Sequence, residues 1–230
     1  FHKSRITKNV TSTCHCHTSH WQLLHVFLNP NRQSEHPFGE YMWIENLFIN
    51  TGKYLSAINY IVEHQPKVIV EYGGGQSTLM ITELVNYLDY GGKVVGYESD
   101  KYWYNDHIEK GWNKHNNIKL VDIVEYTFDG GSEYHNIAGV RYVHSMEDIE
   151  GVDFVIIDGP DLHPKHWKNN PNTTFNLMDI VNHIGYEIPF FIDGRKGTRD
   201  FYTNNKNLPN YFFTCNYKTD IGDIKNANNS

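Results

Sequence analysis

Short apolar runs alternate along this chain with longer segments of helical spacing, and the clearest example spans residues 68–85. Val68-Ile69-Val70 is typical of a strand that is buried on both faces, and three glycines at 73–75 follow it almost directly. The segment from Ser77 to Val85 has the apolar spacing of a helix that faces a sheet. The pattern predicts a strand, a tight glycine turn where backbone approaches another group, and a helix.

The same alternation continues through the chain and predicts one sheet. Two helices are expected between Tyr41 and His64, and others over Tyr102 to His115 and around Thr174 to His183. This order predicts an α/β, Rossmann-like, doubly wound and mostly parallel sheet with an antiparallel edge strand and helices on both faces. The further strands are expected over Lys93 to Glu98, Ile118 to Val124, Val152 to Ile157, Ile188 to Arg195 and, antiparallel at an edge or next to the fifth strand, Tyr211 to Tyr217.

The periodicity divides the chain into three regions. Residues 1–40 are polar and histidine-rich, and we expect an N-terminal extension that packs on the main domain. Residues 41–224 form the predicted domain, and the Asn-rich residues 225–230 form a frayed tail. Within the domain, Glu125 to His144 is interpreted as an insertion or irregular crossover with an extra strand at Val140 to Val143. Because the chain starts at Phe1 rather than Met, we also expect a domain cut from a longer polypeptide.

Composition and charge narrow the function classes. Acidic residues outnumber basic ones by 27 to 20, the net charge is -7, and no Lys/Arg cluster is dense enough to follow a phosphate backbone. Nucleic acid is therefore not expected as a partner. No apolar run of about 18 residues and no signal-peptide pattern is present, so we expect neither a membrane partner nor secretion. Three cysteines cannot form a disulfide framework, which favours the reducing cytoplasm.

One cysteine-containing run raises a question about metal. Cys14-His15-Cys16-His17, with His20 after it, places the usual zinc ligands in a short segment. Adjacent ligands cannot easily close a tetrahedron, and no second CxxC or HxxxH pair completes the set. We interpret the run as a surface segment, with a structural or adventitious metal as the open alternative.

Acidic residues end several of the predicted strands. The carboxyl ends of parallel strands share one edge of a sheet, which is where ligands bind. We therefore expect the acids to line a common crevice, although they are spread over the sequence. Glu98, Asp158 and Asp193 end three strands, and Glu71 lies just before the glycine turn.

Two ligands compete for the glycine turn, with a turn used only for packing as the third alternative. A dinucleotide fingerprint requires G-x-G-x-x-G, and Thr78 stands where its third glycine should be. The other ligand is S-adenosylmethionine, whose cationic sulfonium and amino group favour nearby carboxylates. Glu71 would attract such a cation and repel a pyrophosphate. Glu98 can accept hydrogen bonds from both ribose hydroxyls of either ligand, so it does not distinguish a dinucleotide from S-adenosylmethionine.

These motifs in this order resemble class I S-adenosylmethionine-dependent methyltransferases. The Gly-Gly-Gln-Ser-Thr variant and the Asp-Gly-Pro turn are similar to methyltransferases of glycan and polysaccharide synthesis. The composition also resembles the methyltransferase domain of a large-virus multidomain glycosyltransferase, such as those of chloroviruses. The resemblance covers about Val68 to Asp193 and rests on Glu71-x-Gly73-x-Gly75 with Ser77-Thr78, then Glu98, then Phe154-Val155-Ile156-Ile157-Asp158-Gly159-Pro160.

The resemblance implies a cofactor and its contacts. Glu71 would lie near the methionine amino group and Glu98 would bind the ribose, while Asp122 or Tyr126 would contact adenine. Ser77 departs from the family pattern, where a glycine is more usual, and this departure concerns only the details of the turn. The cofactor would be S-adenosyl-L-methionine, bound by Glu71, Gly73, Gly75, Ser77, Thr78, Glu98 and Asp122.

An alcohol acceptor must lose its proton during methyl transfer, and the candidate general bases are Asp158, Asp161 and His163. Asp158 could instead cap the following loop, and His163 could be a surface histidine. Some sugar and catechol methyltransferases hold a divalent ion at the ends of two neighbouring strands, and Asp158 with Asp193 resembles that pair. Gly194 stands where a second acid is common, so a Mg or Mn ion would need Asp161 as a further ligand.

The leading hypothesis is an S-adenosylmethionine-dependent O-methyltransferase that acts on a hydroxyl of a sugar or glycan. Aromatic rings such as Tyr102 and Trp103 suit stacking on sugars, while Arg195 and Arg199 could bind a charged part of the acceptor or be solvated. The resemblance implies fusion to glycosyltransferase domains and, for a viral protein, the host-cell cytoplasm. The alternatives are a nicotinamide-dependent oxidoreductase and a catalytically inactive cofactor-binding module of a larger glycosyltransferase.

Overall fold

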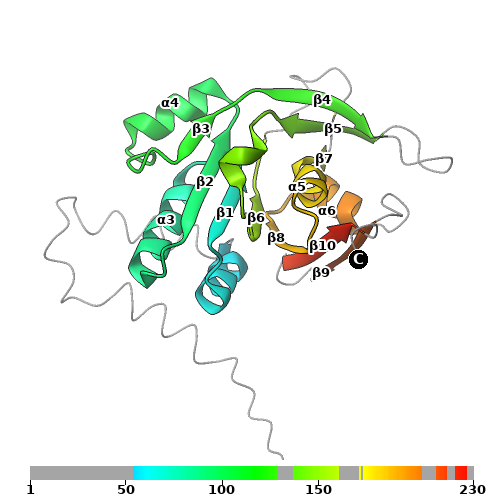
Figure 1. The fold of residues 1–230 in the computed structure, drawn as a ribbon. Coiled ribbons are helices and arrows are strands. Elements are labelled where there is room, and N and C mark those ends of the chain that lie inside the picture. Colours follow the sequence, from blue (N-terminus) through cyan, green and yellow to red (C-terminus); the bar gives the residue numbers. More distant parts are fainter. Residues whose placement is uncertain are drawn as a thin grey trace, which may run out of the picture. The chain divides into compact units, whose positions relative to one another are not determined.

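The computed structural model describes residues 54–128, 137–160, 171, 173–203, 211–216 and 221–226 (Figure 1). The chain divides into two units, Phe1–Asn46 and Leu47–Ser230, and every described residue belongs to the second. The expected N-terminal extension with its Cys14 and Cys16, and the first of the two expected helices, lie outside the described residues.

Seven strands form the main sheet, in the order β3-β2-β1-β6-β8-β10-β9. The first five strands pair in parallel, and helices cover both faces. The predicted α/β, Rossmann-like, doubly wound sheet is therefore confirmed. The strand bounds are β1 (Val68–Tyr72), β2 (Lys93–Glu98), β3 (Ile118–Leu120), β6 (Phe154–Ile157), β8 (Ile188–Ile192), β9 (Tyr211–Asn216) and β10 (Ile221–Asn226).

The last two strands differ from the single final strand that the sequence predicted. β9 occupies the edge, but β10 lies between it and β8 and pairs antiparallel with both. β10 extends to Asn226, so the first two residues assigned to the frayed tail belong to a strand. Its sequence, Ile221-Gly222-Asp223-Ile224, has no apolar run. Backbone pairing with the strands on both sides holds β10 in the sheet.

A second sheet forms in the segment that was expected to be an insertion or an irregular crossover. The predicted third strand, Ile118 to Val124, leaves the main sheet after Leu120, and Val124 belongs to the new strand β4. Its antiparallel partner β5 begins earlier than the expected extra strand and ends at Tyr142, which pairs with Ile123. The order is β4-β5-β7, with β4 (Ile123–Phe128), β5 (Ile137–Tyr142) and β7 (Thr173–Thr174).

Helices pack on the two faces of the main sheet (Figure 1). A helix over residues 54–64 covers one face, where Tyr60 stacks on Phe154 at 4.5 Å between ring centroids. α4 ends at Glu109, earlier than the predicted His115, and α6 was not predicted because its sequence is mostly polar. The other elements are α3 (Gln76–Leu88), α4 (Lys101–Glu109), the 3-10 turn η2 (Met146–Ile149), α5 (Asn176–Ile184) and α6 (Lys196–Thr203).

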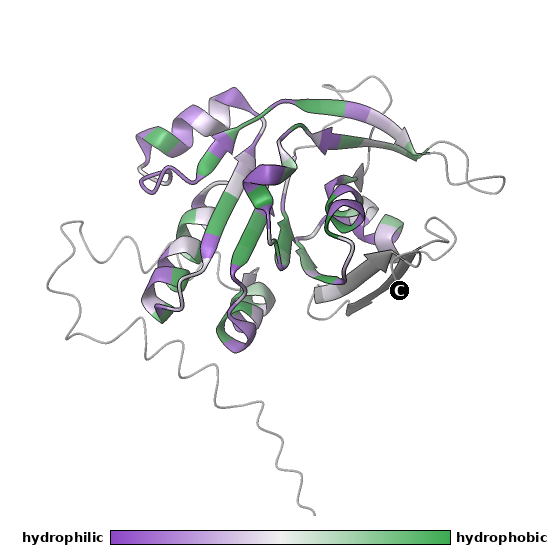
Figure 2. Cartoon of the chain, viewed as in Figure 1, coloured by the Kyte–Doolittle hydropathy of each residue, from purple (hydrophilic) through white to green (hydrophobic). Residues whose placement is uncertain are grey.

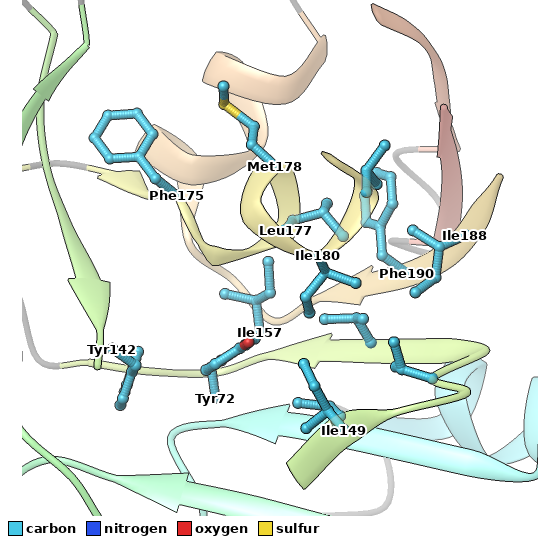
Figure 3. Close-up of a cluster of buried hydrophobic side chains, with 14 of the residues drawn as sticks. Tyr72, Tyr142, Ile149, Ile157, Phe175, Leu177, Met178, Ile180, Ile188 and Phe190 are labelled. Carbon is cyan, nitrogen blue, oxygen red and sulfur yellow. The ribbon is translucent and has the colours of Figure 1, made fainter. Parts of the chain in front are cut away.

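The core lies between the sheet and α5 (Figure 3). Alternation along the strands sends Tyr72 and Ile157 to this face, where Leu177 and Ile180 of α5 are fully buried with them. The hydrophobic colours of Figure 2 accordingly concentrate on the central strands. The same alternation sends Glu71 to the opposite face, toward the helix over residues 54–64.

A search for membrane spans among the described residues finds no helix with the length and apolar character that crossing a bilayer requires.

Candidate functional site

The glycine turn joins the ends of three strands. The amides of Gly73 and Gly74 both donate to the carbonyl of Tyr97 in β2, at 2.8 and 2.9 Å. Gly73 has a φ of +95°, and a Cβ there would lie 2.4 Å from the backbone nitrogen of Gly159. The turn after β1 therefore touches the turn after β6, and only a residue without a side chain fits between them.

The close backbone approach expected at the glycines is found, but its partners are protein atoms. A Cβ at Gly75 would lie 3.0 Å from Nε2 of His107, a buried residue of α4. Gly96 in β2 likewise leaves room for the side chain of Thr78, whose Oγ1 would lie 2.8 Å from a Cβ. Packing alone thus explains the glycines, and the cofactor contacts of Gly73 and Gly75 stay predictions.

Glu98 ends β2 next to this turn, and its carboxylate is fixed by backbone. The amides of Ser99 and Asp100 donate to Oε1 at 2.6 and 2.7 Å. The other oxygen, Oε2, lies 3.8 Å from Nε2 of His107. The Glu98 side chain is 12% exposed, so the carboxylate is held in a defined position with part of its side chain at the surface. Sequence reasoning missed His107, because a histidine in a polar helix carries no signal of its burial.

Glu71 has no exposed surface and is enclosed by hydroxyl groups. The Thr78 hydroxyl donates to Oε2 and accepts the amide of Gly75 at 2.9 Å, which closes the first turn of α3. The hydroxyl of Tyr54 lies 3.2 Å from Oε1, and Ser77 also hydrogen-bonds to the carboxyl group. The structure therefore brings three predicted residues, Glu71, Ser77 and Thr78, together. Tyr54 has no signal in the sequence.

Burial changes the acid-base behaviour of Glu71. Removal from water is the largest cause and raises its pKa from 4.5 to about 7. Hydrogen bonds from Ser77, Thr78 and Tyr54 act in the opposite direction, while the negative charge of Asp158 raises the pKa further. The carboxyl group is thus poised to change charge near neutral pH.

We expect Glu71→Gln to remove a pH dependence of stability. Because the pKa of Glu71 is raised in the folded chain, its contribution to stability is complete below the unfolded value and is lost as the pH rises through about 7. The free energy of unfolding of the variant relative to the parent should therefore increase by about 2 kcal/mol between pH 5 and pH 8. Urea unfolding at both pH values measures this. Glu63→Gln, at an exposed glutamate of the helix over residues 54–64, should show no such change.

Asp158 follows β6 and begins a turn that is held from several sides. The Tyr54 hydroxyl contacts Oδ2 of Asp158 at 2.7 Å, and Thr174 donates to the carbonyl of Gly159 at 3.0 Å. The guanidinium of Arg195 donates to the carbonyls of Asp158 and Pro160. Arg195 was expected to bind the acceptor or to be solvated; its NH1 and NH2 groups instead fix this turn.

Tyr142 of β5 brings the second sheet to the ends of β1 and β6, and its ring lies beside that of Tyr72, with 5.1 Å between the ring centroids (Figure 3). A Cβ at Gly159 would lie 2.1 Å from the Tyr142 hydroxyl, so the glycine leaves room for the tyrosine. The amide of Tyr142 donates to Oδ1 of Asn176 at 2.8 Å, and this bond positions the end of β5. Sequence reasoning missed Tyr142, which lay in the segment interpreted as irregular.

The other predicted catalytic and metal residues are only partly described. Asp161 and His163 lie outside the described residues and stay predictions. Asp193 follows β8, and its amide donates to the carbonyl of Ile157 at 2.9 Å. In the part of the chain that the structure describes, no group of three His, Cys, Asp or Glu side chains is arranged to hold a metal ion. We therefore assign no metal ligand.

The two adenine candidates lie in different surroundings. Asp122 is exposed just after β3, and its carbonyl accepts the amide of Val143 at 2.8 Å. Its adenine contact stays a prediction. Tyr126 belongs to β4 in the second sheet, where Arg141 lies 3.6 Å from its ring centroid and Phe175 contacts it edge-on. The Tyr126 ring is therefore already in contact with protein side chains.

No family model and no curated protein matches the sequence. Solved structures are similar in fold. A Staphylococcus aureus protein assigned as a caffeoyl-CoA O-methyltransferase is 11% identical, with a TM-score of 0.44 over 80% of this chain and 89% of that one. The SAH-bound methyltransferase PaMTH1 of Podospora anserina is 11% identical, with a TM-score of 0.41 over 97% and 99%. A structure of cmcI with SAH is 16% identical, with a TM-score of 0.36 over 74% and 73%. Since these TM-scores are below 0.5, we take the function from the site.

Proposed function

We propose that this protein is an S-adenosylmethionine-dependent O-methyltransferase that acts on a hydroxyl of a sugar or glycan. The observation that carries the proposal is the Glu98 carboxylate beside the glycine turn, fixed by two backbone amides that donate to Oε1, with 12% of its side chain exposed. The site lies between β2 and β6 at the carboxyl ends of the strands, where the strand order reverses on either side of β1. Doubly wound sheets bind nucleotide cofactors at this point.

The charges at this edge favour a cationic ligand. Glu98 and Asp158 lie beside the turn, and the carboxyl group of Glu71 is buried next to it. Ionised carboxyl groups attract a sulfonium and an ammonium group but repel a pyrophosphate. The guanidinium of Arg195 lies 4.0 Å from Asp158 and offsets part of this negative charge while it donates to backbone carbonyls. Thr78, where a dinucleotide fingerprint has its third glycine, hydrogen-bonds to Glu71. These features support S-adenosylmethionine over the nicotinamide alternative.

The chain supplies binding and proton transfer for the proposed reaction. The cofactor, when bound, supplies a methyl group on a positively charged sulfur. Glu98 would hold its ribose hydroxyls, and the acidic edge would hold its positive charges. Asp158 would accept the proton of the acceptor hydroxyl, held in place by Tyr54 through its side chain and by Arg195 through its backbone. Fixed positions for these groups matter because alignment supplies much of the rate of such a displacement.

The sugar acceptor rests on the resemblance of the Gly-Gly-Gln-Ser-Thr and Asp-Gly-Pro motifs and on exposed aromatic rings. Tyr102 and Trp103 on α4 are 71% and 48% exposed, and such rings can stack on sugars and hydrogen-bond to their hydroxyls. Glycosyltransferase domains in the same polypeptide, a cytoplasmic location and the lack of a nucleic-acid or membrane partner belong to this proposal.

Glu98→Gln is expected to weaken cofactor binding by about 10- to 100-fold, because a hydrogen bond to a charged group contributes roughly 1.5–3 kcal/mol. The amide oxygen can still accept the backbone amides, so the loop should stay folded. Glu98→Ala removes both the negative charge and the acceptor for the backbone amides, so it should weaken cofactor binding further. Titration calorimetry with S-adenosylmethionine measures this, with Glu109→Gln, at an exposed position of α4, as the matched control. Equal affinities for Glu98→Gln and the parent would contradict the ribose assignment.

A screen of saccharide acceptors with labelled cofactor tests the proposed function directly. We expect label transfer to at least one saccharide, and a parallel series with a chelator tests metal dependence. Binding of NAD(H) alone in the same calorimeter would favour the oxidoreductase. Tight binding of S-adenosylmethionine without transfer to any saccharide would favour an inactive cofactor-binding module.

A further inference from the structure

Three side chains form a chain of contacts that joins the cofactor motif to the candidate base. The Tyr54 hydroxyl lies 3.2 Å from Oε1 of Glu71 and 2.7 Å from Oδ2 of Asp158. Glu71 is 0% exposed and Tyr54 is 3% exposed. Asp158 is 24% exposed, so it is the member of the chain that meets the solvent and the site.

The two contacts of the Tyr54 hydroxyl compete for one hydrogen. A tyrosine hydroxyl has one hydrogen and can give a full hydrogen bond to only one of the two carboxyl groups at a time. The shorter contact is the one to Asp158, and Ser77 also hydrogen-bonds to Tyr54 and to Glu71. A proton on Glu71 would let Glu71 donate to the Tyr54 oxygen while Tyr54 donates to Asp158.

Glu71 is the carboxyl group better placed to hold such a proton, because it is fully buried and burial favours the neutral form of a carboxyl group. Asp158 is 24% exposed and lies 4.0 Å from the Arg195 guanidinium. The raised pKa of Glu71 agrees with this assignment. The uncharged hydroxyls of Ser77 and Thr78 also hydrogen-bond to Glu71.

We propose that Glu71, Tyr54 and Asp158 are a proton-sharing relay that releases one proton when the cationic cofactor binds and refills with the proton of the acceptor hydroxyl. This inference rests on the proposed function. With a positive charge beside it, the pair is favoured in its doubly ionised form. Glu71 gives its proton to Tyr54 as Tyr54 gives its own to Asp158, and the partly exposed Asp158 releases a proton to solvent. Tyr54 then donates to Glu71.

Turnover returns the relay to the state in which Glu71 is protonated. The acceptor oxygen forms its bond to the methyl carbon, the electron pair of the carbon-sulfur bond stays on sulfur, and the hydroxyl proton passes to Asp158. Asp158 gives a proton to Tyr54 as Tyr54 gives its own to Glu71. The site loses the positive charge on sulfur in the same step, which removes the reason for Glu71 to stay ionised. Tyr54 is a positioning residue in this scheme, because it acts through the two carboxyl groups.

Proton release on binding is the first test. Calorimetric titration of S-adenosylmethionine at pH 6, in two buffers of different ionisation enthalpy, should show release of about one proton per cofactor and almost none at pH 9. SAH, with its neutral sulfur, should release markedly less. Glu71→Gln should bind S-adenosylmethionine more weakly, because one carboxyl group near the cofactor is lost, and its binding enthalpy should be the same in both buffers. Equal enthalpies for the parent protein, or undiminished release from Glu71→Gln, would overturn the relay.

Tyr54→Phe is the second test. Cofactor binding should stay within about threefold of the parent, while the rate of methyl transfer falls by roughly 10- to 100-fold and its pH profile shifts, since general-base assistance is impaired. Tyr60→Phe on the same helix, whose ring packs on Phe154, is the matched control and should change neither. Unchanged turnover in Tyr54→Phe would contradict the relay. If Tyr54→Phe does not fold, the calorimetric measurement of proton release decides. A parent protein with neither cofactor binding nor methyl transfer refutes the proposed function instead.

Discussion

Asp158→Asn is expected to lower the rate of methyl transfer by about 10²- to 10⁴-fold, the usual contribution of a general base. Asparagine has the same shape, and its amide oxygen can accept the Tyr54 hydroxyl. The bonds from Arg195 and Thr174 go to backbone carbonyls of the turn and are untouched by the substitution. The loss should therefore appear in kcat, with cofactor affinity within about tenfold of the parent, because one nearby negative charge is removed.

Single-turnover assays with a saccharide acceptor and parallel calorimetry measure the two quantities. Asp148→Asn is the matched control, since Asp148 lies on the 3-10 turn η2 and pairs with Lys119 at the surface. Undiminished turnover in Asp158→Asn would show that the base lies elsewhere. Asp161 and His163, the other two candidates, would then be the next to substitute.

Gly73→Ala is expected to destabilise the fold by about 4 kcal/mol or more and to abolish cofactor binding. Two costs add. The φ of +95° is unfavourable for a residue with a Cβ, and that Cβ would lie 2.4 Å from the backbone of Gly159, which cannot move without displacing Asp158. The free energy of unfolding in urea measures the first effect, and calorimetry measures the second.

Gly91→Ala separates the two costs. Gly91 also has a positive φ, of +76°, but a Cβ there meets nothing within 4 Å. Gly91→Ala should lower the free energy of unfolding by about 1–2 kcal/mol, the usual effect of a left-handed backbone conformation at a residue with a Cβ. Equal losses for the two variants would mean that the contact between the two turns contributes little.

Much of the fold could be predicted from local pattern. The apolar runs that became β1, β2, β6 and β8 are buried on both faces, and such strands need a continuous apolar sequence wherever they lie in a parallel sheet. β10 escaped prediction because it pairs through backbone on both sides and carries no apolar run. The second sheet escaped because a short strand can leave one sheet for another without a change in its composition.

The candidate site, like the fold, could be predicted only in part from the sequence. The sequence could place Glu98 and Asp158 at one edge of the sheet because acids that end parallel strands must share that edge. The sequence also indicated that the glycines at 73–75 allow close backbone approach. Which group approaches is decided by the tertiary structure, and Gly159 and His107 are those groups because separate segments meet at the turn.

The sequence by itself determined the α/β sheet, the glycine turn and the acids at its edge, because each depends on a repeating pattern or on the direction of parallel strands. Only the tertiary structure decided that Glu71 is buried, that Arg195 holds the turn after β6, and that Tyr54 bridges two carboxyl groups. Tyr54 and Asp158 are 104 residues apart in the chain. A contact over that separation forms when a helix packs on a sheet, and no local pattern of residues encodes it.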